Sequence, residues 1–316
     1  MSHVAPRRHR PADRRRFVVA AGVALLAIVT VVLCVIALTQ FRGEPSAGQI
    51  RATTSSPTPT VTPTSDPTEG PTSPQVALVA PKRLLSAFDG TNVYRATVAA
   101  CPDSRTSFEL SDDGGVTWQT SDVAGSTGSS AALNLTAGSR DFVHMVTLAT
   151  DDCAPQYLRS FVGGIEWQVF DADLPVTWFF DAADPSTLNS PDGVRSTPCT
   201  TVWMAATGSR AAVLCSDSTI FTTTDAATSW SEPISVPNAA AIGVSPSGYR
   251  VALLNAEGCT GIQLGELVDG DLSGLGACLP VEAAQADVAV ATAADGATFV
   301  WAGDIFSGSP NGGATW

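Results

Sequence analysis

Histidine is scarce in this sequence, and no two cysteines are separated by only two residues. Three of the 316 residues are histidine, and His144 is the only one beyond residue 39. Structural zinc sites draw on clustered cysteine and histidine side chains, often with two residues between paired cysteines. The sequence therefore argues against a zinc site. Residues 269–273 begin like a calcium-binding loop, but Pro280 stands where such a loop has its twelfth-position glutamate, and a degraded copy of a repeat is the preferred interpretation. No metal or other cofactor is expected.

Basic residues are also few once the first 16 residues are left aside. Residues 1–16 contain six arginines and one aspartate, whereas the rest of the chain contains 11 basic and 29 acidic residues. An acidic domain of this kind repels the phosphate groups of nucleic acids and of anionic lipid surfaces. Nucleic acid is therefore not an expected partner, and only the basic N-terminus and the apolar segment after it are suited to a membrane.

Residues 17–39 form an apolar segment without a charged side chain. At about 1.5 Å per residue, a helix of this length spans roughly 34 Å, enough for a hydrocarbon core of about 30 Å. The arginines before it predict that the N-terminus faces the cytoplasm. A cleaved signal peptide fits less well because residues 37–40 make a poor cleavage site, and a lipoprotein signal at Cys34 lacks the small residue expected before the cysteine. We therefore expect an uncleaved single-pass anchor.

Residues 40–74 are rich in proline, threonine and serine, as in Thr-Thr-Ser-Ser-Pro-Thr-Pro-Thr at residues 53–60. Such a composition cannot form a core and favours extended polyproline II structure. Fully extended at about 3.1 Å per residue, the segment would span roughly 110 Å. We expect a disordered stalk that lifts a folded domain, residues 75–316, off the outer surface of the membrane.

A short repeat recurs along residues 75–316. Residues 111–118, Ser-Asp-Asp-Gly-Gly-Val-Thr-Trp, fit the pattern S-x-D-x-G-x-T-W at every fixed position. Degraded copies occupy residues 160–167, 223–230, 267–274 and 309–316. Glycine allows the turn a positive φ, and the aspartate can accept N–H bonds within the same hairpin. The motif therefore predicts a structural turn and not a catalytic site.

The residues assigned to this structural role are Ser111, Asp113, Gly115, Thr117, Trp118, Gly164, Trp167, Asp225, Trp230, Asn311, Gly313, Thr315 and Trp316. The repeat resembles the Asp-box, or BNR, motif of sialidase-like β-propellers. The eighth positions of its copies are separated by 49, 63, 44 and 42 residues, which leaves room for four short strands per copy. The resemblance implies an all-β propeller of about five blades, with the boxes serving the fold.

Apolar runs rich in β-branched residues, broken by Gly, Asn and Pro turns, supply a strand pair before each box. The predicted pairs are 83–88 with 93–99, 131–135 with 142–148, 202–206 with 211–214, 240–244 with 249–254, and 288–291 with 298–301. The sequence stops at Trp316, so the fifth blade lacks a fourth strand. We expect residues 75–80 to supply that strand and to close the ring, as N-terminal strands do in many propellers.

The 63-residue spacing breaks the regularity of the repeat. Its extra length falls around residues 181–198, directly after Trp178, Phe179 and Phe180. Long loops on a regular fold commonly carry function, and aromatic side chains stack on sugars or anchor protein partners. These three aromatic residues are therefore candidate binding residues, with a buried core strand as the alternative.

One of the seven cysteines, Cys34, lies in the predicted span, which leaves six outside and 15 possible sets of three disulfides. The blade scheme narrows the choice, because it places four of these six at turns between second and third strands on one face of the ring. The pairs that it predicts are Cys199–Cys215 and Cys259–Cys278 across hairpins and Cys101–Cys153 between neighbouring blades.

The catalytic pattern of sialidases is missing from the sequence. Those enzymes use three arginines, a tyrosine–glutamate pair and an early Arg-Ile-Pro motif, but residues 81–85 read Pro-Lys-Arg-Leu-Leu. No catalytic residue is assigned, and an enzyme is not expected.

The Ala- and Arg-rich composition looks bacterial. We expect a membrane-anchored binding or scaffolding module in the cell envelope, with a protein partner. The alternative is polysaccharide binding or glycoside hydrolysis, which two carboxylates about 5–9 Å apart in a central pocket would favour.

Overall fold

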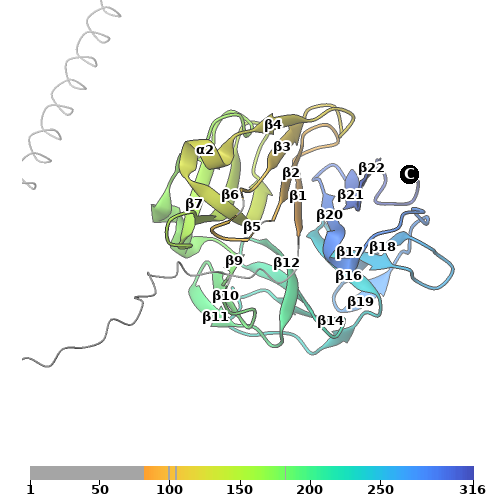
Figure 1. The fold of residues 1–316 in the computed structure, drawn as a ribbon. Helices are drawn as coiled ribbons and strands as arrows, with labels where there is room; N and C mark the ends of the chain where they lie inside the picture. The colour runs from red at the N-terminus through yellow and green to blue at the C-terminus, as the bar shows by residue number, and fades with distance from the viewer. Residues whose placement is uncertain (1–81, 99, 104, 182) are drawn as a thin grey trace, which may run out of the picture. The chain divides into compact units, whose positions relative to one another are not determined.

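The computed structural model describes residues 82–98, 100–103, 105–181 and 183–316 (Figure 1). The predicted tail, membrane span, stalk and closing strand at residues 75–80 lie outside these ranges. Within the described ranges, no helix combines the length and the apolar character needed to cross a membrane. Their structure is almost all β, with the short helix α2 (Val123–Thr127) and the 3-10 helices η1 (Asp171–Val176) and η2 (Gln285–Asp287).

The described strands form six antiparallel sheets, which we name blades A to F in chain order and which are arranged as a ring (Figure 1). Blade A contains β1 (Arg83–Ala87), β2 (Val93–Thr97), β3 (Phe108–Ser111) and β4 (Gln119–Ser121). Blade B contains β5 (Ser129–Ala137), β6 (Val143–Ala149), β7 (Pro155–Ser160) and β8 (Gln168–Val169). Blade C contains β9 (Phe179–Phe180), β10 (Thr187–Ser190) and β11 (Gly193–Ser196).

Blade D contains β12 (Thr201–Thr207), β13 (Arg210–Cys215), β14 (Thr219–Thr223) and β15 (Ile234–Ser235). Blade E contains β16 (Ala239–Val244), β17 (Tyr249–Leu254), β18 (Ile262–Val268) and β19 (Asp271–Ser273). Blade F contains β20 (Val288–Thr292), β21 (Thr298–Ala302) and β22 (Ile305–Ser309). The first strand of each blade lies innermost, and β1 lies beside β20, so that blades F and A close the ring.

The prediction of about five blades is wrong, because the structure has six. Residues 181–198, expected to be a loop, contain β10 and β11 and form most of blade C. This blade carries no box, and its strands have only two to four residues, so neither the repeat nor the strand pattern revealed it. Each of the five predicted strand pairs is present, and blade F has three described strands.

The copy of the repeat at residues 267–274 is a different structure from the others. There β18 and β19 are joined by the two residues Asp269 and Gly270, which have φ values of 49° and 90°. Two successive residues with positive φ are typical of the tight hairpin turns that match the twist of antiparallel strands. Blade E therefore has a simple hairpin where its neighbours have a longer box turn.

The blades pack on one another through apolar side chains. Between blades A and B, Phe108 is fully buried and meets Trp167 edge to face, with ring centres 4.9 Å apart. Between blades F and A, the guanidinium of Arg83 lies 4.4 Å from the ring centre of Trp301 and 3.7 Å from the Asp287 carboxylate. The closure between first and last blade thus combines a cation–π contact with an ion pair.

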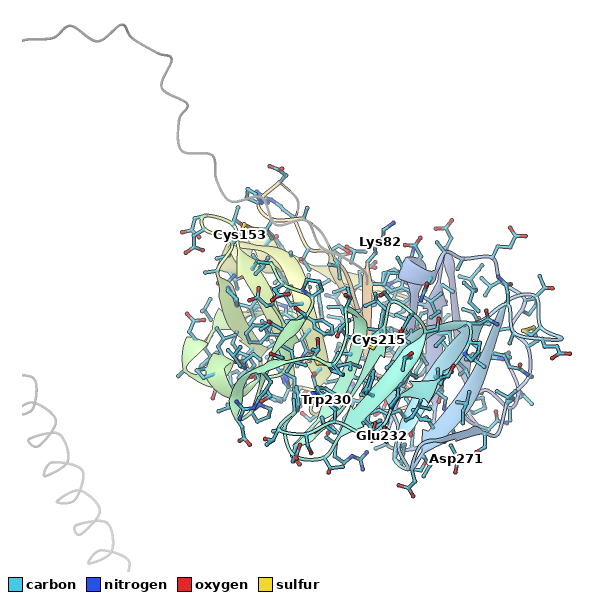
Figure 2. The ribbon with its side chains drawn as sticks, turned by 90° about the horizontal axis from the view of Figure 1, so that it is seen from below. Lys82, Cys153, Cys215, Trp230, Glu232 and Asp271 are labelled. Carbon is cyan, nitrogen blue, oxygen red and sulfur yellow. A yellow bond between two sulfur atoms is a disulfide. The ribbon has the colours of Figure 1, made fainter. Side chains whose placement is uncertain are left out.

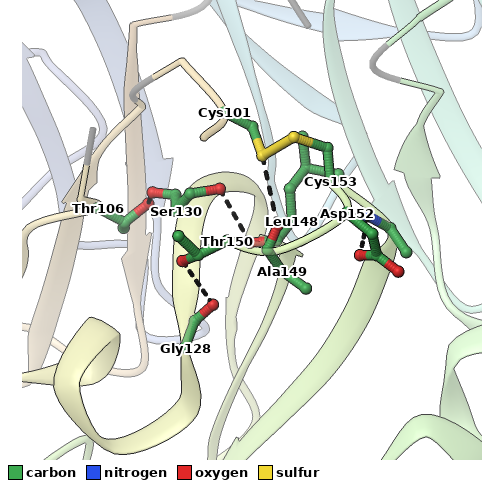
Figure 3. Close-up of a disulfide and its surroundings, with 10 residues drawn as sticks. Cys101, Thr106, Gly128, Ser130, Leu148, Ala149, Thr150, Asp152 and Cys153 are labelled. Atoms are coloured by element: carbon green, nitrogen blue, oxygen red, sulfur yellow. Dashed lines mark hydrogen bonds between the residues drawn. A yellow bond between two sulfur atoms is a disulfide. The ribbon is translucent and has the colours of Figure 1, made fainter. Parts of the chain in front are cut away.

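Three disulfides are formed, with the pairing that the blade scheme predicts: Cys101–Cys153, Cys199–Cys215 and Cys259–Cys278. The first joins the loop after β2 in blade A to the loop after β6 in blade B (Figure 3). Beside it, the Thr106 hydroxyl donates to the carbonyl of Ser130, which adds a second link between these two blades. Loops after second strands all emerge at one side of the ring, which we call the disulfide face.

The opposite side carries the box turns and the hairpin turns between first and second strands, and we call it the box face. The amides of Gly114, Gly163 and Ala226 in three box turns donate to carbonyls in the hairpin turn of the same blade, at 2.8–2.9 Å. In Figure 2, Lys82 and Cys153 lie at one side of the ring, and Trp230 and Glu232 lie at the other.

Candidate functional site: the central channel and its mouth

The innermost strands of all six blades surround a channel of about 230 Å³ along the axis of the ring. Its lining consists of residues 84–87, 133–137, 180, 203–207, 242–244 and 290–292. Most of these side chains are apolar, and none of them is ionisable. Gly243 permits this narrow packing, because a Cβ there would lie 2.8 Å from the carbonyl oxygen of Val290 on the neighbouring strand.

The polar groups of the channel wall serve the fold. The Ser86 hydroxyl accepts the Ala137 amide at 2.9 Å, and the Asn134 side chain donates to the Trp178 carbonyl at 2.6 Å. The Trp203 indole donates to the Ile242 carbonyl, also at 2.6 Å. Each of these bonds joins one blade to the next, so the wall is held together by polar groups that are already satisfied.

The channel widens at the box face into a mouth of about 600 Å³. Half of its lining residues are small and apolar, Phe88 and Pro246 add larger apolar surfaces, and Thr207, Ser245 and Thr292 add hydroxyl groups. Among the described residues, Arg210 is the only one with an ionisable side chain that lines the mouth. Such a surface can bury apolar groups of a partner and hold one anionic or carbonyl group by charge-assisted hydrogen bonds.

Arg210 is held in place by Tyr249. Its guanidinium carbon lies 5.9 Å from the centre of the Tyr249 ring and it also hydrogen-bonds that residue's hydroxyl. Burial raises the pKa of Tyr249, and the positive charge of Arg210 offsets part of the rise. Tyr249 therefore stays a neutral phenol at physiological pH, and its hydroxyl and ring fix the position of the Arg210 side chain at the mouth.

The box turns in blades A, B, D and F share one geometry. The first hydroxyl of each turn accepts the amide four residues later: Ser111 from Gly115, Ser160 from Gly164, Thr223 from Ala227 and Ser309 from Gly313, at 2.8–3.2 Å. The fourth and fifth residues of each turn have positive φ. The tryptophans close the turns or pack on a neighbour; Trp118, for example, donates to the Gly115 carbonyl at 3.1 Å.

The acids of the box turns are occupied by local hydrogen bonds. Asp113 accepts the Thr117 hydroxyl at 2.6 Å and the Thr117 amide at 2.9 Å, which lowers the pKa of its carboxyl to about 2. Asp225 accepts the same two groups of Ser229, and the pKa of Asp225 is also about 2. Asn311 takes the same place in blade F and accepts the Thr315 amide at 2.9 Å. A carboxylate held in this way is a turn residue.

The candidate binding residues Trp178, Phe179 and Phe180 lie in and beside β9, the innermost strand of blade C. Trp178 and Phe179 are buried, with 6% and 8% of their surfaces exposed. The Trp178 indole donates to the Gly208 carbonyl of blade D at 2.8 Å. Only Phe180 faces the central channel. Trp178 and Phe179 are thus core residues, Phe180 lines the channel, and the three do not form an exposed aromatic platform.

The features of a hydrolase are not gathered in the channel. No carboxylate of the described ranges lines the channel or its mouth. The Tyr94 hydroxyl donates to the Arg140 carbonyl at 2.7 Å, which leaves it no glutamate partner. Among the described residues, no three His, Cys, Asp or Glu side chains are grouped so that they could hold a metal ion.

Sequence reasoning did not find the channel or its mouth. The lining comes from six strands that lie far apart in the chain, and its small apolar residues look like ordinary core residues. Arg210 stood in a predicted hairpin turn, where nothing marks it as different from the other arginines. The only sequence signal is the run of small residues in the first strand of each pair, such as Ala205 and Ala206.

No model of a known protein family matches the chain, and a search of curated proteins finds no match. Similar solved structures include YCF48 bound to D1 peptide, with 16% identity and a TM-score of 0.40 over 77% of this chain and 84% of that chain. A point mutant of the Aleuria aurantia lectin in complex with α-methyl-L-fucoside has 11% identity and a TM-score of 0.44 over 73% and 96%. BamB from Moraxella catarrhalis has 10% identity and a TM-score of 0.33 over 71% and 80%. No function is carried over from these proteins.

Proposed function

We propose that this chain is a binding and scaffolding module that holds a partner protein at the mouth of its central channel. The observation that carries the proposal is the channel itself, whose lining side chains are mostly apolar and, among the described residues, never ionisable, while polar atoms make up about half of its exposed wall. Such a surface gains free energy when it covers apolar side chains, at roughly 25 cal/mol per Å². Glycoside hydrolysis would instead need two carboxylates at the site.

The mouth adds selectivity to this apolar surface. A segment of a partner that enters it can place apolar side chains on Phe88 and Pro246 while Arg210 binds a carboxylate or a backbone carbonyl. Interfaces of this kind concentrate their binding energy in a few central contacts, and arginine is frequent among them. Replacement of Arg210 by Gln is therefore expected to weaken binding of the partner about tenfold or more.

Site-specific photocrosslinking in cells that express the full chain tests this function. A photoreactive amino acid is placed at Ala294, which is exposed at the mouth, or at Glu257, an exposed control position in the loop between β17 and β18 on the disulfide face. We expect one protein to be captured from position 294 and not from position 257, with capture reduced by Arg210→Gln. If position 294 captures no protein while the chain retains and shortens polysaccharide, the scaffold function is wrong.

The same proposal places the module outside the cytoplasm, on an anchor formed by residues 17–39. The support for this placement is the uncharged stretch, the arginines before it and the proline-rich stalk after it. Protease added to intact cells should remove an epitope tag at the C-terminus and spare one at the N-terminus. Protection of both tags would contradict the proposed orientation.

A further inference from the structure

A second cavity lies between blades D and E, at the box face and away from the ring axis. It has a volume of about 340 Å³, and it shares only Arg210 with the channel mouth. One side is formed by Thr222–Thr224 at the end of β14 and by residues 231–234 around β15. The other side is formed by residues 247–249, by Leu267 and by the turn of Asp269 and Gly270. We call this cavity the D–E cleft.

The walls of the D–E cleft are held rigidly. The Ser247 hydroxyl donates to the Glu266 carboxylate, which also lies 2.7 Å from the Arg250 guanidinium. Gly248 packs so closely on β18 that a Cβ there would lie 2.3 Å from the Leu267 carbonyl oxygen. The turn between β16 and β17 therefore cannot move away from β18 without breaking several contacts. A preformed wall of this kind lowers the entropy lost when a ligand binds.

Several polar groups of the D–E cleft have no partner within the described chain. The carboxylates of Glu232 and Asp269 and the hydroxyl of Thr224 make no hydrogen bond or ion pair with other described residues. Arg210, on the same cleft, forms no ion pair with any described carboxylate and bonds only the Tyr249 hydroxyl. Two acceptors, one hydroxyl and one cationic donor are thus available to a ligand. Pro233 and Ile234 supply apolar surface beside them.

The charges of the D–E cleft limit the class of ligand. An anion would meet two carboxylates for one guanidinium, in a domain whose residues 82–316 include nine basic and 26 acidic side chains. A cation would meet Arg210. A neutral ligand with several hydroxyl groups suits both the carboxylates and the guanidinium, because a hydroxyl donates to a carboxylate and accepts from a guanidinium. Its C–H surfaces fit the apolar part of the wall.

We infer that the D–E cleft is a binding site for a single sugar residue, held by Glu232, Asp269 and Arg210. The volume of about 340 Å³ lies at the lower end of the range for small-molecule sites. The inference does not rest on the proposed protein-binding function, since the cleft and the channel lie at different places on the box face. Because Arg210 lines both places, a protein at the mouth and a glycan in the cleft would compete for its guanidinium.

Saturation-transfer difference NMR on the purified full-length chain in detergent tests the inference. The probes are the methyl glycosides of glucose, galactose, mannose, rhamnose, arabinose and N-acetylglucosamine, each tested alone. Alanine serves as a probe that is neutral overall but carries separated charges. The variants are Glu232→Gln and Asp269→Asn. Asn tolerates the left-handed backbone of residue 269, so this variant keeps the turn.

Two exposed carboxylates outside the cleft provide matched controls. Glu257→Gln repeats the chemistry of Glu232→Gln in the loop between β17 and β18, and Asp271→Asn repeats that of Asp269→Asn at the start of β19. We expect at least one glycoside to bind, both cleft variants to weaken it about tenfold or more, and both controls to leave it unchanged. Each lost bond involves a charged acceptor, which is the reason for the size of this effect.

Three results would overturn the inference. The first is that none of the glycosides receives saturation transfer. The second is that a glycoside binds equally well to the cleft variants and to the unchanged chain. The third is that alanine displaces the glycoside in a manner that depends on Glu232 and Asp269, which would make the cleft a site for zwitterions. None of these results bears on crosslinking at Ala294, so each proposal can fail without the other.

Discussion

Blades B and C are neighbours in the ring, but each blade is held in place by different contacts. Blade B has a box turn between β7 and β8, whose Gly164 lies against the ring of Phe108 in blade A and whose Trp167 meets the same ring edge to face. Blade C has no box and no fourth strand among the described residues. Its Asn189 side chain instead donates to backbone carbonyls around η1, including that of Thr177 at 2.6 Å. A box turn is therefore one way to hold a blade in place, and a strand side chain that donates hydrogen bonds to an irregular connector is another.

The effect of this difference extends to the next blade. In the box turns of blades A, B and F, a Cβ on the fifth residue would lie within 2.0–3.0 Å of Phe306, Phe108 and Leu264, each on the third strand of the preceding blade. The box turn of blade D follows blade C and has Ala227 at the fifth place. Blade C offers no comparable side chain on β11, so the methyl group of Ala227 fits and is buried.

The largest expected effect compares one aromatic residue in each kind of blade. Phe108→Ala in blade A should lower the free energy of unfolding by about 3–5 kcal/mol, because it removes a fully buried ring between two blades. Phe180→Ala in blade C should cost less, because that ring faces the channel and is only partly buried. Urea unfolding of both variants measures the difference. Equal losses would mean that blade C is packed as tightly as the blades with boxes.

The disulfides distinguish links between blades from links within a blade. Replacement of Cys101 and Cys153 by Ala opens a link between cysteines 52 positions apart and should cost about 4 kcal/mol from chain entropy. The same change at Cys199 and Cys215, which are 16 positions apart, should cost about 3 kcal/mol. Denaturant unfolding of oxidised samples measures both. A larger loss from the second pair would show that the short hairpin link, and not the link between blades, limits stability.

The disulfide pairing is also the prediction from the sequence that the structure confirms most fully. Blade lengths place Cys101 and Cys153 at equivalent turns, and the same reasoning pairs the other four cysteines across hairpins. This works because a propeller repeats its strands at similar spacing, so a position relative to one box predicts a place in space. The five strand pairs succeeded for the same reason, since each combines apolar β-branched runs with a Gly, Asn or Pro turn.

Blade C and the two cavities were missed because they depend on features that have no local pattern. The strand Phe179–Phe180 has only two residues, too few for alternation to be visible. Trp178 was a candidate binding residue because it precedes the longest spacing of the repeat. The alternative, a buried core strand, could not be distinguished from it, since a buried indole and an exposed one look alike in a sequence. The D–E cleft joins Arg210, Glu232 and Asp269, which belong to separate strands and turns and meet only after the two blades pack.

The fifth residue of the box turn allows a reciprocal exchange. Gly164→Ala should cost about 3 kcal/mol, because Gly164 has a φ of 92° and a Cβ there would lie 2.5 Å from the Phe108 ring. Ala227→Gly, at the same place in blade D, should change stability by less than about 0.5 kcal/mol. Relief of the positive φ of 63° is offset by greater freedom of the unfolded chain and by loss of a buried methyl group. A mild effect of Gly164→Ala would contradict the close packing of blades A and B.

Blades C and F differ in where a missing fourth strand could come from. We expect residues 75–80 to pair with β22, so their deletion should lower the free energy of unfolding by about 2 kcal/mol, the contribution of burying one leucine-sized side chain. Deletion of residues 60–65 in the stalk is the control and should have no effect. Thermal unfolding compares the melting temperatures of the two deletion variants. Equal melting temperatures would show that residues 75–80 do not pair with β22.

The smallest expected effect compares the box turns of blades A and F as the pH falls. Asp113 has a pKa of about 2 in the folded chain against an ordinary value of 3.8, because Thr117 donates two hydrogen bonds to its carboxylate. A carboxyl whose pKa is lowered by folding stabilises the fold above its ordinary pKa, and this contribution is lost as the pH falls from about 4 to 2. Asn311 makes the corresponding bond in blade F without a titrating group, so the contribution of that turn to stability should not change as the pH falls.

Asp113→Asn should therefore make blade A resemble blade F. The variant should lose less stability than the unchanged chain between about pH 4 and pH 2, because an amide keeps its acceptor oxygen at every pH. Asp112→Asn, next to it in the same turn, removes a carboxylate that makes no hydrogen bond within the described chain and should leave the slope unchanged. Urea unfolding at several pH values in this interval measures the slope. If Asp112→Asn and Asp113→Asn flatten it equally, the general negative charge of the domain governs its acid stability, and the bonds of the box turn do not.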